Sequence, residues 1–213
     1  MRLGNRPLLG NVLERAKRAT SLHEVVLATT RLPQDDCIAD LGHNYEISVF
    51  RGHPTDLVDR YYNAALCFNA EVVVRIPADN PLIHPSEIDR IVEYYLSSGV
   101  DFASNIGPFL DNQYPDGLGA EVFSVKLLEM LYKDVKDPRH REHVTTFFRE
   151  QPLRFKLGTV KCPEAFRRPD IKLDVNTRED YDFLVQMFDQ LNQPNKLIDI
   201  TEIILWYDSK TAK

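Results

Sequence analysis

The sequence lacks long apolar runs, and its cysteines are few and scattered. No apolar run approaches the ~18 residues that a membrane helix needs, which argues against a membrane partner. No apolar stretch typical of a secretion signal follows Met1. Cys37, Cys67 and Cys162 form no CxxC pair, so they indicate neither a disulfide framework nor a zinc site. We therefore expect reduced thiols and a cytoplasmic location.

An excess of basic residues is also absent. The 213 residues include 26 Lys and Arg against 32 Asp and Glu, which gives a formal net charge of −6. This mild acidity argues against a nucleic-acid partner, because such proteins present a basic surface. The chain contains no GxGxxG motif, Walker A loop or GxSxG elbow. Its 43% of hydrophobic residues exclude a mainly disordered chain and predict a single domain, residues 1–213.

Short β-branched apolar runs alternate with amphipathic segments in the first half of the chain. The predicted strands are 24–29, 47–50, 71–76 and 100–104, and the predicted helices are 6–19, 34–42, 55–69 and 85–97. Continuous apolar strands alternating with helices predict an α/β fold with a parallel sheet covered on both faces. Ligands of such sheets bind beyond the carboxyl ends of the strands.

The pattern changes after residue 105. A loop rich in Gly, Pro, Asp and Asn is followed by a strand (AEVFS), helices near 124–133 and 139–149, strands at 153–160 and 171–175, and helices at 177–191 and 198–207. We interpret residues 106–150 approximately as an insertion. Its apolar residues exceed what a lone excursion should expose, which predicts a homodimer; they are Phe109, Leu110, Val122, Phe123, Leu127, Leu131, Phe147 and Phe148.

Asp79 stands directly after a predicted buried strand, in the segment Arg75-Ile-Pro-Ala-Asp79-Asn-Pro. A carboxylate there points at the ligand edge of the sheet, and Mg²⁺ usually takes one or two carboxylates plus substrate phosphates. The alternative is that Asp79 shapes the turn before Pro81. Both interpretations stay open at this point.

A second acidic segment runs from Lys172 to Asp180. On a strand, Asp174 and Asn176 project to the same side. Thr177 and Asp180 also resemble a capping box for the next helix, although Glu or Gln is the usual partner. Capping alone is therefore a strong alternative to a functional role for this segment.

Other candidate residues follow the predicted strands or stand in turns. Thr29 and Thr30 end one strand, and Arg51 with Gly52 ends the next, where an arginine and a close backbone approach suit a phosphate. For Asp56 and Arg60, which follow Gly52, we prefer the interpretation that they are exposed helix charges. His143 lies in a predicted helix, where a structural histidine is more common than a base.

Taken together, these segments resemble one family. ATTRLPQDD, FRGHPTDLVDRYYNAA, VVVRIPADNPLI, DFASN, YPDGLGAEVFS, REHVT and LDVNTREDYDFL occur in its order and cover nearly the whole chain. The sequence is similar to the cytidylyltransferases related to spore coat polysaccharide biosynthesis protein F. That group is related to the 3-deoxy-manno-octulosonate and acylneuraminate cytidylyltransferases.

The resemblance implies a Rossmann-like nucleotidyltransferase fold with three α/β/α layers. It implies that CTP and an acidic or amino sugar react to give a CMP-sugar and pyrophosphate, with Mg²⁺ bridging phosphates and carboxylates. Asp79 and Asp174 would be the catalytic carboxylates and, with Asn176, the metal ligands. The nucleotide-binding candidates are Thr29, Thr30, Arg51, Gly52 and Arg75. The sugar-binding candidates are Tyr114, Asp116, Gly117, Glu121, Glu142 and His143.

The chain also departs from the family pattern. The first strand and its ARxxSxRLPxK triphosphate loop are missing from the sequence as given, because residues 1–16 match the family only after that loop. Pro77-Ala78 replaces Thr-Gly, Asn176 replaces a carboxylate, and Gly119 replaces an Asp. We therefore expect weak or no turnover from this chain. A cytidylyltransferase, a degenerate binding or assembly module, and a sugar-phosphate binding protein remain as alternatives.

Overall fold

The computed structural model describes residues 1–193 and 196–211. Its strands are β1 Arg2–Leu3, β2 Arg6–Pro7, β3 Val26–Thr30, β4 Ser48–Gly52, β5 Val72–Arg75, β6 Phe102–Ser104, β7 Glu121–Ser124 and β8 Leu157–Gly158. Its α-helices are α1 Leu8–Ala16, α2 Asp36–Asn44, α3 Leu57–Cys67, α4 Pro85–Ser98, α5 Val125–Asp134, α6 Pro138–Glu142, α7 Thr146–Arg149, α8 Arg178–Leu191 and α9 Ile200–Thr211. Short 3₁₀ turns are η1 Pro33–Asp35, η2 Phe109–Asp111 and η3 Glu164–Phe166.

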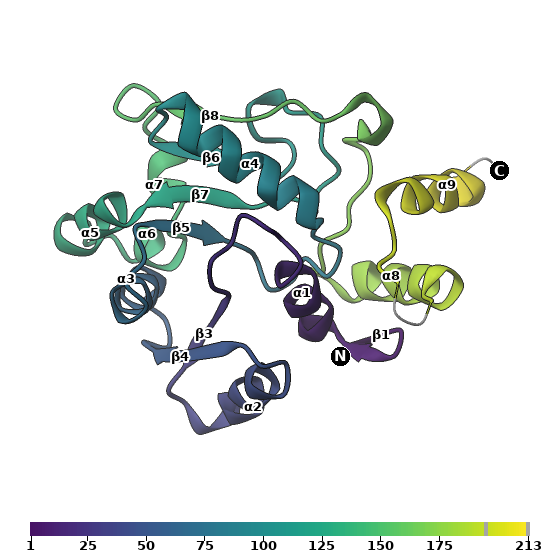
Figure 1. The fold of residues 1–213 in the computed structure, drawn as a ribbon, viewed down its shortest axis with the longest axis horizontal. Helices are drawn as coiled ribbons and strands as arrows, with labels where there is room; N and C mark the ends of the chain where they lie inside the picture. The colour runs from purple at the N-terminus through teal and green to yellow at the C-terminus, as the bar shows by residue number, and fades with distance from the viewer. Residues whose placement is uncertain (194–195, 212–213) are drawn as a thin grey trace.

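Four strands form the main sheet, in the order β5-β7-β6-β8. β7 runs antiparallel to both β5 and β6, whereas β8 is parallel to β6. Three of these four strands therefore share one direction, and helix α4 covers one face (Figure 1). The prediction of an α/β fold with a mostly parallel sheet is confirmed. The register pairs Arg75 of β5 with Glu121 of β7.

Strands β3 and β4 form a separate parallel pair. Within the described residues, β3 pairs only with β4 and β5 pairs only with β7, so each of β3 and β5 keeps a free edge. Figure 1 shows this pair set apart below β5, with α3 beside both parts. No residue of β3 or β4 belongs to the three hydrophobic clusters found in the described chain. The pair is therefore held to the rest mainly through α3.

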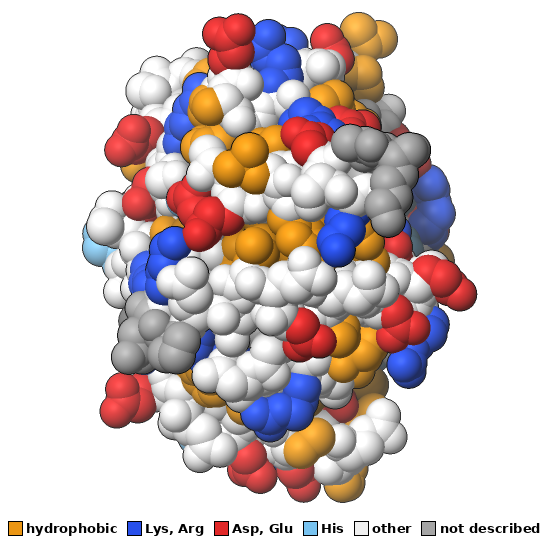
Figure 2. Space-filling view, turned by 90° about the vertical axis from the view of Figure 1, so that its right-hand side faces the viewer, with side chains coloured by type: hydrophobic (Ala, Val, Ile, Leu, Met, Phe, Trp, Pro, Cys, Tyr) orange, Lys and Arg blue, Asp and Glu red, His pale blue; other side chains and the backbone are white. Residues whose placement is uncertain are grey.

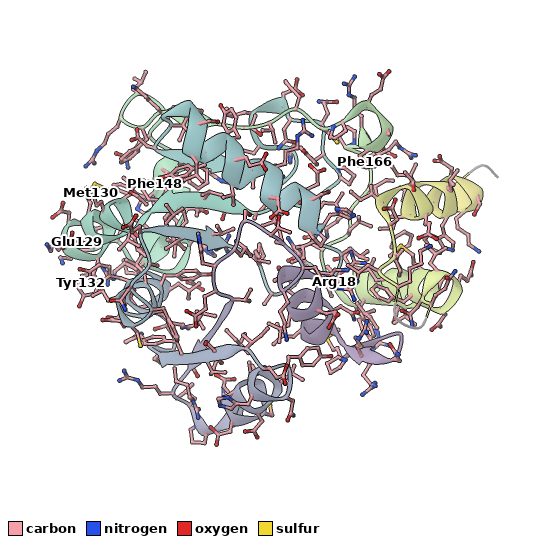
Figure 3. All side chains as sticks on the ribbon, viewed as in Figure 1. Arg18, Glu129, Met130, Tyr132, Phe148 and Phe166 are labelled. Carbon is pink, nitrogen blue, oxygen red and sulfur yellow. The ribbon has the colours of Figure 1, made fainter. Side chains whose placement is uncertain are left out.

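The region predicted as an insertion belongs largely to the main body. β7 lies between β5 and β6, at the centre of the sheet. Phe148 of α7, which is labelled in Figure 3, packs on Phe102 and Phe123, with ring centroids 5.7 and 5.8 Å away. Val122, Phe123, Leu131 and Phe148 are fully buried within this chain, whereas Leu110 is exposed. The apolar residues invoked for a homodimer are thus mostly core residues, and the dimer stays a prediction without that support.

Helix boundaries follow local signals. Pro85 begins α4 at the first helical position, and Gly99 ends it in the left-handed conformation. α3 is capped by Asp56, which accepts the N–H of Asp59 at 2.9 Å. The strand predicted at 171–175 is reduced to one bridge between Asp116 and Lys172.

The cysteines and the apolar character of the helices were both subjects of expectations from the sequence. Cys37, Cys67 and Cys162 are all free thiols. Among the described residues, no helix has the length and apolarity needed to cross a bilayer. The face at the right of Figure 1 carries basic and acidic side chains interspersed among apolar ones (Figure 2).

Candidate functional site

A cavity of about 280 Å³ lies at the carboxyl end of β5. Its walls are Arg75, Pro77, Asp79, Asn80, Ile106, Asp116, Glu121, His143, Thr145, Thr146, Arg149 and Asp174. Six of the predicted site residues are therefore brought together: Arg75, Asp79, Asp116, Glu121, His143 and Asp174. Binding beyond the carboxyl ends of strands was the sequence-based expectation for such a sheet.

Main-chain hydrogen bonds bring three acidic segments to this cavity. The carbonyl oxygen of Asp79 accepts the N–H of Val175 at 3.0 Å. Asp116 donates its N–H to Ile171 at 3.0 Å, and its carbonyl accepts the N–H of Leu173 at 3.1 Å. The segment that carries Asp174 is therefore tied by its backbone to both other carboxylate-bearing segments.

Asp79, Asp116 and Asp174 form an acidic wall of the cavity, and their carboxylates interact with one another. Burial raises the pKa of Asp116, and the charges of Asp174 and Asp79 raise it further. Oδ1 of Asp79 and Oδ1 of Asp174 are buried and accept no hydrogen bond within the described structure. An unsatisfied buried carboxylate oxygen is costly and calls for a partner. A cation or a ligand donor would satisfy both atoms.

Gly117 allows the acidic segments to approach closely. Its φ is +89°, and a Cβ there would stand 2.8 Å from the nitrogen of Asp174 and 2.8 Å from the carbonyl carbon of Leu173. Gly117 therefore acts through the backbone, by making room for the segment that carries Asp174.

Asn176 lies outside the cavity lining, and its amide Nδ2 donates to Oδ2 of Asp174. The structure thus shows Asn176 in contact with a candidate ligand, and its place among the metal ligands stays a prediction. The predicted capping box is confirmed: Thr177 accepts the N–H of Asp180, and Asp180 accepts the N–H of Thr177 at 2.8 Å. Thr177 and Asp180 therefore cap α8, while Asp174, a few residues earlier, lines the cavity.

Arg75 and Arg149, joined through Glu121, form a basic wall of the same cavity. Glu121, only 1% exposed, bonds Arg75 through Oε2 and Arg149 through Oε1, the latter at 2.6 Å. Glu121 was predicted to bind a sugar, but both of its oxygens are taken by arginines. Arg149 was not predicted, because nothing in the local sequence marks the end of α7 as part of the site. Burial opposes the charge of Arg75, but Glu121 and Tyr61 together outweigh this effect and raise the pKa of Arg75.

The predicted nucleotide-binding residues of β3 and β4 form their own network. Arg51 donates to the carbonyl of Thr30 at 2.8 Å and pairs with Asp36 at 2.6 Å, and Thr30 bonds Asp35. Thr29, Thr30, Arg51 and Gly52 do not line the cavity described above. Their proposed nucleotide contacts stay predictions, because the separated β3–β4 pair does not bring them to the acidic wall.

Two predicted sugar-binding residues also lie elsewhere. Tyr114 is buried at 1% exposure, donates its hydroxyl to Glu87 and accepts from Arg90 at 3.1 Å. Burial and Glu87 raise the pKa of Tyr114. Glu142 is exposed and outside the cavity lining, whereas the adjacent His143 lines it. Tyr114 therefore supports the turn that carries Asp116 rather than facing a ligand.

The acidic wall suits Mg²⁺ only together with a ligand. Among the described residues, no group of three or more His, Cys, Asp or Glu side chains is arranged to hold a metal ion. Mg²⁺ demands six oxygen ligands but often takes only one or two carboxylates, the rest coming from phosphates and water. Oδ1 of Asp79 and Oδ1 of Asp174, which accept no hydrogen bond within the described structure, fit that requirement.

The fold places the chain in a class. A solved structure of a cytidylyltransferase from Leptospira borgpetersenii serovar Hardjo-bovis matches with a TM-score of 0.86 and 29% identity, covering 98% of this chain and 87% of that one. The architecture is that of the Rossmann-like nucleotidyltransferases, as expected.

The chain belongs to the cytidylyltransferase family, whose model matches residues 1–204. It is 36% identical to the uncharacterized protein MJ1063 of Methanocaldococcus jannaschii over 211 residues, which cover 98% of this chain and 82% of that protein. It is 24% identical to the spore coat polysaccharide biosynthesis protein SpsF of Bacillus subtilis over 196 residues, 90% of this chain and 79% of that one. The resemblance stated from the sequence motifs is confirmed.

Proposed function

We propose that the protein binds CTP and Mg²⁺ in this cavity. It transfers the cytidylyl group of CTP to an acidic or amino sugar, for use in polysaccharide biosynthesis. The observation that carries this proposal is that two buried oxygens, Oδ1 of Asp79 and Oδ1 of Asp174, accept no hydrogen bond, the second having only a 4.0 Å ion-pair contact with Lys172. Both stand at the edge of the sheet where ligands of such folds bind. Family membership supplies the reaction class.

The chemistry requires positioning and charge neutralisation more than proton transfer. A sugar hydroxyl attacks the α-phosphorus of CTP, the bond to the β-phosphate oxygen breaks, and pyrophosphate leaves. Bound Mg²⁺ would neutralise phosphate charge as it develops. Asp79 and Asp174 would hold the ion, and the backbone bond between Asp79 and Val175 fixes their segments relative to each other.

Calorimetric titration of CTP with and without Mg²⁺ tests this function. Wild-type protein should bind CTP more tightly with Mg²⁺, and Asp79→Asn should lose that Mg²⁺-dependent part. Asp182→Asn is the matched control, because Asp182 pairs with Arg178 on the exposed face of α8. Identical Mg²⁺-dependent affinity in wild type and Asp79→Asn would contradict the assignment.

A second candidate is a binding or assembly module without turnover. It is favoured by the β3–β4 pair, whose Thr29, Thr30 and Arg51 lie outside the cavity, and by Asn176, which bonds Asp174 instead of adding a carboxylate. Pyrophosphate release with CTP, Mg²⁺ and a panel of acidic and amino sugars separates the two. Turnover near ~1 s⁻¹ would rule out the second candidate.

We also keep the homodimer as a proposal, since closed two-fold pairs are the commonest oligomers. Light scattering tests it. A mass near 24.6 kDa, that of one chain, at micromolar concentration would contradict it.

A further inference from the structure

Glu87 carries a buried carboxylate that does not line the cavity. It lies in the first turn of α4 and is 3% exposed. A buried carboxylate is costly unless positive charge and hydrogen-bond donors surround it. The positive end of the helix macrodipole favours the charge, and Nη1 of Arg90, on the same helix, lies 3.7 Å from Oε2 of Glu87. The remaining requirement is a hydrogen-bond donor from another part of the chain.

Tyr114 supplies that donor. Its hydroxyl donates to Oε2 of Glu87 and accepts from Nη1 of Arg90 at 3.1 Å. A hydrogen bond to an ionised carboxylate is about twice as strong as one between neutral groups. The side chains of Tyr114 and Glu87 are both buried, so water does not replace this bond. It therefore fixes the ring of Tyr114 against α4.

Glu87 holds the loop that carries Tyr114 at two places. This loop, residues 105–120, joins β6 to β7. Nδ2 of Asn105 donates to the carbonyl oxygen of Glu87 at 2.8 Å, and Oδ1 of Asn105 accepts the N–H of Ala120 at 2.9 Å. The main chain of Glu87 thus holds the base of the loop, and its side chain holds the middle of the loop at Tyr114.

The turn that Tyr114 anchors carries Asp116 two residues later. Asp116 donates its N–H to the carbonyl of Ile171, and its own carbonyl accepts the N–H of Leu173. Asp174 follows Leu173 directly and lines the cavity with Asp116. A displacement of Tyr114 is therefore passed through two backbone hydrogen bonds to the segment of Asp174.

We infer that Glu87 is a positioning residue, whose bond to Tyr114 holds Asp116 and Asp174 in place at the cavity. Its consequence for ligand binding rests on the proposed function: the bond strengthens the Mg²⁺-dependent part of CTP binding. Neither Glu87 nor Tyr114 lines the cavity, so their substitution leaves every side chain of the cavity wall unchanged in kind. Any effect on binding must then pass through the loop.

Native-state hydrogen exchange tests the positioning without any ligand. The reporters are the amides of Asp116 and Leu173, whose bonds join the two acidic segments. Tyr114→Phe removes the hydroxyl alone. It should raise the exchange rates of both amides about 10- to 100-fold, the effect of losing a hydrogen bond to a charged group. The amide of Leu184, within α8, follows the stability of the whole fold and should change less.

Glu87→Gln separates the hydrogen bond from the charge. Tyr114 can still donate to the amide oxygen of Gln, so the exchange rates of this variant should lie between those of wild type and Tyr114→Phe. The double variant should exchange no faster than Tyr114→Phe, because effects within one bonded pair do not add.

Tyr62→Phe is the matched control. The hydroxyl of Tyr62 also bonds a glutamate, Glu129 at 3.3 Å, between α3 and α5. Neither residue lines the cavity, and neither belongs to the loop of Tyr114. Tyr62→Phe should leave the exchange of Asp116 and Leu173 unchanged.

Calorimetric titration with CTP measures the consequence for binding. In Tyr114→Phe the Mg²⁺-dependent part of the affinity should weaken about tenfold, as when a group that orients a metal ligand is removed. CTP affinity without Mg²⁺ should stay the same. A general loosening of the fold does not produce this split.

Two results overturn the inference. The first is an equal change of exchange at Asp116, Leu173 and Leu184 in Tyr114→Phe. The second is a CTP affinity in that variant that is unchanged, or that falls equally with and without Mg²⁺. If Tyr114→Phe does not fold, Glu87→Gln carries both measurements. If wild type shows no Mg²⁺-dependent CTP binding, the proposed function fails, and exchange at the two reporter amides alone decides whether Glu87 positions the turn.

Discussion

The carbonyl oxygen of Asp79 accepts the backbone N–H of Val175 at 3.0 Å. This bond joins the end of β5 to the segment that carries Asp174, so the separation of the two carboxylates is set by the main chain. Substitutions of the carboxylate side chains should therefore change ligand binding with little effect on the fold.

The amide of Asn176 should orient Asp174 for cation binding. Asn176→Ala removes the donor to Asp174 and should weaken Mg²⁺-dependent CTP affinity by about tenfold, the usual effect of removing a group that orients a metal ligand. Calorimetry measures it. Asn63→Ala is the control, since Asn63 makes a comparable bond to Asp59, at 3.0 Å, away from the cavity. Unchanged affinity in Asn176→Ala would show that Asp174 needs no such support.

Gly117 and Gly99 allow strain and crowding to be separated. Both have positive φ, but a Cβ on Gly99 meets nothing within 4 Å, whereas one on Gly117 meets the backbone of Leu173 and Asp174 at 2.8 Å. Gly99→Ala should cost about 1–2 kcal/mol of unfolding free energy. Gly117→Ala should cost a further ~1–3 kcal/mol because atoms must move. Chemical denaturation measures both, and equal losses would refute the crowding argument.

The β3–β4 pair should open more easily than the main sheet. It has a free edge, and no residue of either strand belongs to a hydrophobic cluster of the described chain. Native-state hydrogen exchange should therefore show lower opening free energies for β3 and β4 than for β6 and β7. Protection of β3 equal to that of β7 would mean that the pair is stabilised by contacts not present here.

His84 should make stability fall in mild acid. Burial, and then the charge of Arg15, lower the pKa of His84 in the folded protein below its ordinary value of 6.5. As pH falls below about 6.5, the unfolded chain therefore binds a proton that the folded chain resists. The free energy of unfolding falls as the unfolded chain takes up this proton. The contribution of His84 to that free energy is therefore largest above about pH 6.5.

Denaturation of wild type and His84→Gln between pH 5 and pH 8 tests this effect. The His84→Gln variant should lose less stability on acidification than wild type, because one proton-linked group is gone. Gln keeps a polar partner for Ser86, which bonds His84 Nδ1 at 2.8 Å. Parallel pH profiles for the two proteins would show that His84 titrates normally.

Local signals in the sequence determined most elements of secondary structure. The helices expected at 85–97 and 177–191 occur as Pro85–Ser98 and Arg178–Leu191, because apolar periodicity, Pro85, Gly99 and the Thr177 cap are all local. The acidic wall was also predictable. Asp79 comes shortly after β5, which ends at Arg75, and the motifs around Asp116 and Asp174 belong to the resemblance, so each could be found without knowing the three-dimensional contacts.

The tertiary structure alone decided the basic wall and the layout of the sheets. Arg75, Glu121 and Arg149 are brought together by strand pairing and by the docking of α7, and no local pattern relates residues so far apart in the chain. Pairing likewise put β7 between β5 and β6 and, among the residues that the structure describes, left β3 and β5 each with a free edge. Periodicity determines which residues form a strand and which face is apolar. The choice of neighbour depends on backbone hydrogen bonds and packing between distant segments, which the sequence does not display locally.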